Sequence, residues 1–67
     1  MYEYIFILEE SMISLMISKG NATLPIKAGE EVMILDNLYL CSRIRWMFND
    51  NSAKCVIYLS GPHKTTK

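Results

Sequence analysis

The sequence predicts an all-β fold, a small antiparallel barrel of five or six strands. Turn signals rich in Gly, Asn, Asp and Pro recur at short intervals, and the runs between them are rich in Ile, Val and Tyr. Short strands at this spacing are typical of sandwiches and small barrels. The chain has 67 residues, 51% of them hydrophobic and 21% charged, which is the composition of one ordered domain. We expect residues 1–60 to form this domain and residues 61–67 to form a flexible polar tail.

Six apolar runs between the turn signals are the expected strands: Tyr2–Leu8, Met12–Ser18, Ala22–Lys27, Glu31–Asp36, Leu38–Met47 and Lys54–Ser60. The first is apolar on both faces, because Tyr4 and Phe6 alternate with Ile5 and Ile7. A strand of this kind is central in its sheet or packs against a second copy of the chain. The fourth run has the same property, so we expect a homo-oligomer.

The second run, Met12–Ser18, also fits a helix. Its methionines and Leu15 are spaced for one helical face, and Gly20 is a natural stop signal. The serines and β-branched isoleucines within the run disfavour a helix interior. A helix at residues 10–19 is the alternative, and it would make the fold α+β.

Pro25 interrupts the third run. Because proline has no backbone N–H, the strand Ala22–Lys27 is expected to lie at a sheet edge or to be bulged. An edge strand can accept a strand from another protein, which makes the surroundings of Pro25 a candidate docking site.

The last two runs are expected to form a hairpin around a four-residue turn at residues 49–52. Pairing Phe48 with Ala53 creates one mostly apolar face, made by the pairs Trp46 and Cys55, Ile44 and Ile57, and Ser42 and Leu59. The other face contains the pairs Met47 and Lys54, Arg45 and Val56, and Arg43 and Tyr58. Side chains alternate along a strand, so a slip of one residue would destroy this segregation. We therefore expect Trp46 in the core and a basic, aromatic outer face.

The two cysteines are expected on opposite faces of this hairpin, with Cys55 inward and Cys41 outward. A disulfide needs Cα atoms within about 7 Å and Cβ atoms that face each other. We therefore expect two free thiols and a reducing compartment, the cytoplasm. Glu9 and Glu10 interrupt the apolar N-terminal stretch, so we expect no membrane span and no membrane partner.

The net charge of zero is the sum of two opposite halves. Residues 1–36 hold six acidic and two basic residues (−4), whereas residues 37–67 hold one acidic and five basic residues (+4). Such asymmetry indicates a polar partner or head-to-tail self-association, unless the fold interleaves the two halves in space. We favour interleaving.

The segment Ala22–Leu35 resembles the middle of an SH3-type barrel. An apolar strand, a Lys/Gly/Glu turn and an alternating strand follow one another, carried by Leu24, Ile26, Gly29, Glu30, Val32 and Ile34. The hairpin that follows sits where the next hairpin of the family would be, so the resemblance covers residues 22–60. It implies an SH3-like barrel topology. The tandem Trp pair and the Pro-x-x-Asn-Tyr element of the family are absent, so proline-peptide binding is not implied.

The sequence contains no catalytic or metal-binding signature. His63, the only histidine, lies in the polar tail, where nothing would hold a general base or metal ligand in place. The cysteines lack the CxxC spacing of a zinc site, and the glycines are too far apart for a phosphate-binding loop. We expect no enzymatic activity, no metal and no cofactor.

One group of side chains on the outer face is the candidate partner-binding site: Tyr39, Arg43, Arg45, Lys54 and Tyr58. Tyr and Arg are enriched at protein interfaces, so we expect a protein-binding module or small inhibitor that docks through this face. A compact chain rich in Ile, Met and Lys also fits a virus- or phage-encoded modulator of a host protein. The alternative is a single-stranded nucleic-acid or RNA-binding barrel, in which the cations neutralise phosphates and the tyrosines stack on bases.

Overall fold

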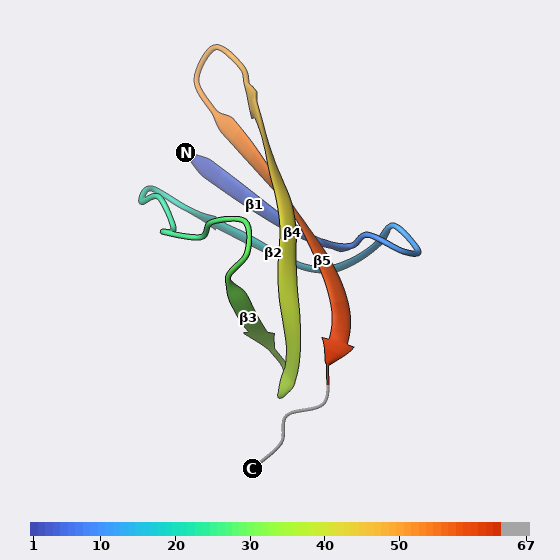
Figure 1. The fold of residues 1–67 in the computed structure, drawn as a ribbon. Coiled ribbons are helices and arrows are strands. Elements are labelled where there is room, and N and C mark those ends of the chain that lie inside the picture. Colours follow the sequence, from blue (N-terminus) through green and yellow to red (C-terminus); the bar gives the residue numbers. More distant parts are fainter. Residues whose placement is uncertain (64–67) are drawn as a thin grey trace.

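A computed structural model describes residues 1–63, which form one sheet of five strands (Figure 1). The strands are β1 (Tyr2–Leu8), β2 (Ile13–Gly20), β3 (Glu31–Ile34), β4 (Asn37–Phe48) and β5 (Ala53–His63). Their order in the sheet is β2-β1-β5-β4-β3, and the sheet curls into a half-barrel. The expectation of an all-β fold is confirmed. The alternative of a helix at residues 10–19 is wrong, since most of this segment is β2.

One pair of neighbouring strands departs from the expected antiparallel arrangement. β1 and β5 run parallel, with Tyr4 beside Cys55 and Phe6 beside Ile57. The other three pairs are antiparallel. Parallel neighbours need a long connection, and the whole chain between β1 and β5 supplies it here. No described residue belongs to a helix that is long and apolar enough to cross a membrane.

The hydrophobic core lies on the concave side of the half-barrel. Its buried members are Tyr4, Phe6, Ile34, Tyr39, Cys41, Cys55, Ile57 and Leu59. β5 supplies more of them than any other strand, because it lies between β1 and β4 in the centre of the sheet. Its residues 55–59 are buried without interruption.

Residues 21–30 cross the structure without forming the strand that was expected at Ala22–Lys27. The backbone N–H of Leu24 donates to the hydroxyl oxygen of Tyr4 over 2.7 Å, and Ile26 packs against the core. These contacts hold the segment in place together with backbone hydrogen bonds that join Gly29 and Glu30 to Cys41 of β4. The expected edge strand at Pro25 is therefore wrong, and the edges of the sheet are β2 and β3.

A β-bulge at Ser42 decides which residues of β4 face the core. Between the turn and the bulge the register is the expected one, with the pairs Phe48 and Ala53, Trp46 and Cys55, Ile44 and Ile57, and Arg43 and Tyr58. At Ser42 the register shifts by one residue, so that Cys41 instead of Ser42 lies opposite Leu59. An extra residue in one strand reverses the facing of everything beyond it.

This reversal corrects two expectations about side-chain orientation. Cys41 and Tyr39 were expected to point outward, but Cys41 is fully buried and Tyr39 is 6% exposed. Cys41 and Cys55 are both free thiols, as expected. At its far end β5 continues to His63, which lies opposite Leu38, so residues 61–63 belong to a strand. The remainder of the expected tail lies outside the described residues.

Candidate binding site

The structure separates the five residues that were expected to form one binding face. Tyr39 belongs to the core, on the opposite side of the sheet. Arg43 and Arg45 are exposed on the convex side, and Lys54 is half-buried there. Tyr58 also points to the convex side, yet it is only 5% exposed. The expected pair of stacking tyrosines is therefore not available at the surface.

Arg43 covers part of the Tyr58 ring. The guanidinium carbon of Arg43 lies 4.2 Å from the centre of the Tyr58 ring, in a cation–π contact between two residues that the hairpin register paired. Nε of Arg43 also donates to Glu9 over 3.1 Å, and the other carboxylate oxygen of Glu9 accepts from Oγ of Ser42 over 2.7 Å. Arg43 is thus occupied with contacts that tie the end of β1 to the bulge in β4.

The acidic and basic halves of the chain meet in space, as expected. Glu9 forms its ion pair with Arg43, and Glu3 lies between Lys19 and Lys54 in the strand register. This interleaving places a carboxylate beside several of the cations. The convex face consequently carries less net positive charge than the second half of the sequence indicates, which weakens the case for a surface that tracks phosphates.

A different group of side chains forms an exposed aromatic surface, and one of them, Trp46, was expected in the core. We call it the aromatic end, and it consists of Tyr2, Trp46 and Phe48. Trp46 is 39% exposed and Phe48 is 74% exposed. The Phe48 ring stacks on Trp46 with 5.8 Å between centroids and 10° between planes. Tyr2 meets Trp46 edge-on at 6.3 Å, so the three rings form one continuous surface.

Trp46 also packs against the core. The core residue Tyr4 contacts it edge-on, with centroids 5.9 Å apart and planes at 76°. Trp46 pairs with Cys55 of β5, and its side chain lies on the concave face, as expected. Trp46 therefore has the expected orientation but lies at the open rim of the core.

The rim is open because β3 is short. β3 pairs only with residues 37–40 of β4, and the remaining part of β4 up to Phe48 extends beyond it. Side chains on the concave face of this extension have no neighbouring strand on one side. The signal in the sequence was a length mismatch: the expected strand Leu38–Met47 is much longer than the run Glu31–Asp36 before it.

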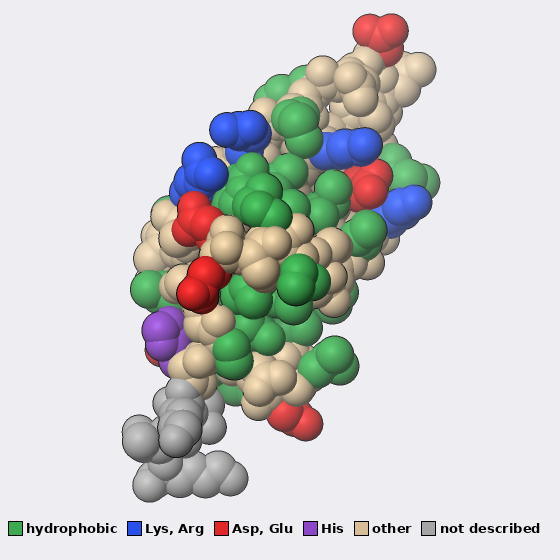
Figure 2. All heavy atoms as spheres, turned by 90° about the vertical axis from the view of Figure 1, so that its right-hand side faces the viewer, with side chains coloured by type: hydrophobic (Ala, Val, Ile, Leu, Met, Phe, Trp, Pro, Cys, Tyr) green, Lys and Arg blue, Asp and Glu red, His purple; other side chains and the backbone are tan. Residues whose placement is uncertain are grey.

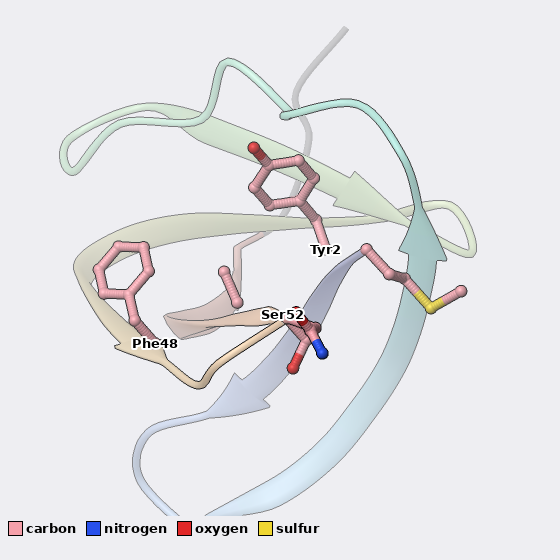
Figure 3. A pocket seen from close by; sticks show the side chains of 6 residues that line it. Tyr2, Phe48 and Ser52 are labelled. Carbon is pink, nitrogen blue, oxygen red and sulfur yellow. The ribbon is translucent and has the colours of Figure 1, made fainter.

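A pocket with a volume of about 240 Å³ adjoins the aromatic end (Figure 3). Its lining residues are Met1, Tyr2, Phe48, Asn51, Ser52 and Ala53. Figure 3 shows the rings of Tyr2 and Phe48 set apart from one another across the pocket. The backbone N–H of Ala53 donates to the carbonyl oxygen of Met1 over 3.1 Å, which joins the hairpin turn to the start of β1. The walls of this open pocket are polar and apolar in about equal measure.

The buried thiols are poor candidates for chemistry. Burial raises the pKa of both Cys41 and Cys55, so both stay protonated at neutral pH, and thiolates are the nucleophilic and metal-binding form. Within residues 1–63, no three His, Cys, Asp or Glu side chains lie close enough to hold a metal ion.

Comparisons of this chain with protein-family models, with curated proteins and with solved structures find no significant match. The five-stranded half-barrel is compatible with a small barrel. The site is therefore interpreted from its own geometry.

Proposed function

We propose that this chain is a non-enzymatic protein-binding module that contacts its partner through the aromatic end. The observation that carries the proposal is the stack of Trp46 and Phe48, which is exposed and already assembled. Aromatic residues dominate binding hot spots, where they fill pockets on the partner. Rings held on a paired strand lose little conformational freedom on binding, so more of the contact energy appears as affinity.

The remaining surface supports a macromolecular partner. Large hydrophobic side chains that are at least 37% exposed are Met1, Met12, Ile13, Met16, Ile17, Leu24, Met33, Leu35, Leu40, Trp46, Met47 and Phe48. Figure 2 shows hydrophobic side chains gathered over the middle of one face, with charged side chains around them. Exposed apolar patches of this kind mark interaction sites on small proteins. A partner protein, a second copy of the chain, or both would cover them.

A module of this type acts by occupying a surface of its partner, as an inhibitor or modulator does. An SH3-like barrel in the cytoplasm is consistent with the half-barrel and the two free thiols. Arg45 and Lys54, on the convex side of the same hairpin, would supply cations to the border of the interface.

Binding of single-stranded nucleic acid is the second candidate. It is favoured by one observation, the exposed Phe48 ring face on a strand that also carries Arg45. Bases stack on such rings, and nearby cations neutralise phosphates. The two candidates differ in salt dependence, because phosphate contacts weaken steeply as salt rises and apolar contacts do not.

Affinity capture from cell lysate tests the proposal. Three immobilised proteins are compared: the unchanged chain, Phe48→Ser and Leu35→Ser. Leu35 is 86% exposed in the turn between β3 and β4, so its substitution is the matched control for removing an exposed apolar side chain. We expect the unchanged chain and Leu35→Ser to retain the same protein after nuclease treatment and at high salt. Phe48→Ser should lose about 30-fold or more in affinity, the size of a hot-spot effect.

Equal retention by Phe48→Ser would rule out the aromatic end as the contact. Retention that disappears with nuclease would establish the nucleic-acid candidate instead.

A further inference from the structure

Several stretches of strand edge within residues 1–63 are open, and they differ in protection. β3 has four residues, which is too short to template much pairing. The open part of β4 carries Arg43 and Arg45 and ends at the bulge. Charged side chains and bulges protect an edge from further pairing. β2 is eight residues long and has no charged residue before Lys19, although its register with β1 shifts at Leu15. It is the longest of these stretches that carries a single charged residue.

The outer edge of β2 has neither backbone nor side-chain cover. β2 pairs with β1 alone, and within residues 1–63 no other backbone hydrogen bond reaches Ile13–Gly20. Ile13 is 57% exposed, Met16 41% and Ile17 53%. A strand with open N–H and C=O groups and apolar side chains on both faces is a template for another strand.

The charges at the two ends of β2 identify the occupant. The turn before β2 carries the exposed carboxylate of Glu10, and the end of β2 carries the exposed ammonium group of Lys19. When β2 pairs antiparallel with a second β2, each acidic end lies beside the basic end of the other chain. A parallel arrangement would place like charges together, which is unfavourable for directly opposed residues.

We infer that β2 pairs antiparallel with β2 of a second copy of this chain, which joins two half-barrels into one continuous sheet. The arrangement has two-fold symmetry, so it is self-limiting and the open edge is used once in each copy. It covers Ile13, Met16 and Ile17 and satisfies the open backbone groups of the edge. This inference concerns a different surface from the aromatic end and does not depend on the proposed function.

Sedimentation equilibrium of the full chain tests the pairing. We expect a reversible dimer, and we expect Ile17→Lys to weaken dimerisation by at least about tenfold, since an edge lysine opposes strand addition. Leu35→Lys is the matched control, because it places the same charge on a more exposed leucine away from β2. A monomer at all concentrations, or a dimer that Ile17→Lys leaves unchanged, would overturn the inference.

A charge exchange tests the antiparallel direction. Lys19→Glu alone and Glu10→Lys alone each place two like-charge contacts in a homodimer, so each should dimerise about tenfold more weakly than the unchanged chain. A mixture of the two variants restores both opposite-charge contacts and should form the heterodimer preferentially. Lys19 also lies opposite Glu3 within one chain, so the mixture is compared with Lys19→Glu by itself. In a parallel pair the unchanged chain would already oppose Glu10 with Glu10 and Lys19 with Lys19, so single variants that dimerise as tightly as the unchanged chain would contradict antiparallel pairing.

The two proposals fail separately. Phe48→Ser should leave the dimer intact, and Ile17→Lys should leave partner capture intact. A dimer lost in Phe48→Ser but kept in Ile17→Lys would show that the aromatic end is the self-association surface, which would overturn pairing through β2.

Discussion

Cys41 of β4 lies opposite Leu59 of β5, one position away from the partner that the hairpin turn dictates. Both side chains are fully buried. Ser42 is the extra residue that produces this shift, and its hydroxyl donates to Glu9 over 2.7 Å, with the carbonyl oxygen of Tyr58 as a second nearby acceptor at 3.1 Å. The bulge therefore determines that the first half of β4 contributes Cys41 and Tyr39 to the core.

Deletion of Ser42 should leave the facing of the core residues unchanged. Without Ser42, Arg43 follows Cys41 directly, and regular alternation keeps Cys41 on the concave face in the register that already pairs it with Leu59. We expect the free energy of unfolding to fall by only about 1 kcal/mol, through the lost contacts of the Ser42 hydroxyl. Ser42→Ala loses the same contacts and should cost about as much. Urea unfolding followed by Trp46 fluorescence measures both, and a deletion that costs about 3 kcal/mol more than Ser42→Ala would contradict the role of Ser42 as an extra residue.

The thiols of Cys41 and Cys55 should be unreactive in the native state. Both are buried and their pKa values are raised by that burial, so a thiol reagent at pH 8 should react only as fast as the chain opens. In about 6 M urea, which unfolds small domains, both thiols should react at the rate of free cysteine. Rapid labelling of the native chain would contradict the placement of Cys41.

The same raised pKa values predict an alkaline loss of stability. The fold favours the protonated thiols, whereas thiols of the unfolded chain ionise at about pH 8.5. The stabilisation that the two protonated thiols contribute is complete below about pH 8.5. It falls as the pH rises above this value, because the unfolded state then binds fewer protons than the folded state. A Cys41→Ala, Cys55→Ala double variant should lose this component, as measured by urea unfolding between pH 7 and pH 10 (a range of about 1.5 units on each side of the free thiol pKa).

Arg43 should stabilise the fold through geometry as well as charge. Arg43→Lys keeps the charge but loses the planar stack on Tyr58 and the Nε donor to Glu9. The Arg43 side chain is 55% exposed, so solvent screens the ion pair, and we expect a loss of only about 0.5–1 kcal/mol. Arg45→Lys is the matched control on the same strand and should change the free energy of unfolding by less than about 0.5 kcal/mol. Equal losses in urea unfolding would show that the stack contributes nothing.

The turn between β3 and β4 has an unfavourable residue that can be improved. Leu35 and Asp36 connect the paired residues Ile34 and Asn37, and both have positive φ (50° and 67°). Two-residue hairpin turns of this kind prefer Asn first and Gly second, and a leucine at positive φ is strained. Leu35→Asn should raise the free energy of unfolding by about 1 kcal/mol. Leu35→Ala, which keeps the strain, should change it little; equal effects of both would contradict the explanation.

Local pattern was sufficient to predict much of this fold. Alternation and turn residues predicted β1 with its exact bounds, the hairpin turn, and the register from Phe48 to Arg43. They failed at Ser42, because a single inserted residue changes facing without changing composition. They also failed at Ala22–Lys27, where a hydrogen bond to Tyr4 and packing of Ile26 replace strand pairing.

The aromatic end was missed because its exposure depends on long-range strand overlap. The face of Trp46 was predicted correctly, but its exposure depends on how far β3 extends beside β4. The parallel pairing of β1 with β5 is likewise a long-range choice. Strand order and strand overlap are set by the assembly of the whole sheet, and no short segment of the sequence encodes them.

Amide hydrogen exchange of the full chain, alone and bound to the protein that it captures, tests whether the aromatic end is the partner-binding surface. We expect slower exchange in the complex at Tyr2 and at residues 46–53, where the aromatic end and its pocket lie. Exchange at the β3–β4 turn, residues 35–37, should be unchanged. Protection confined to other segments, with residues 46–53 exchanging as in the free chain, would contradict the assignment of the aromatic end as the partner-binding surface.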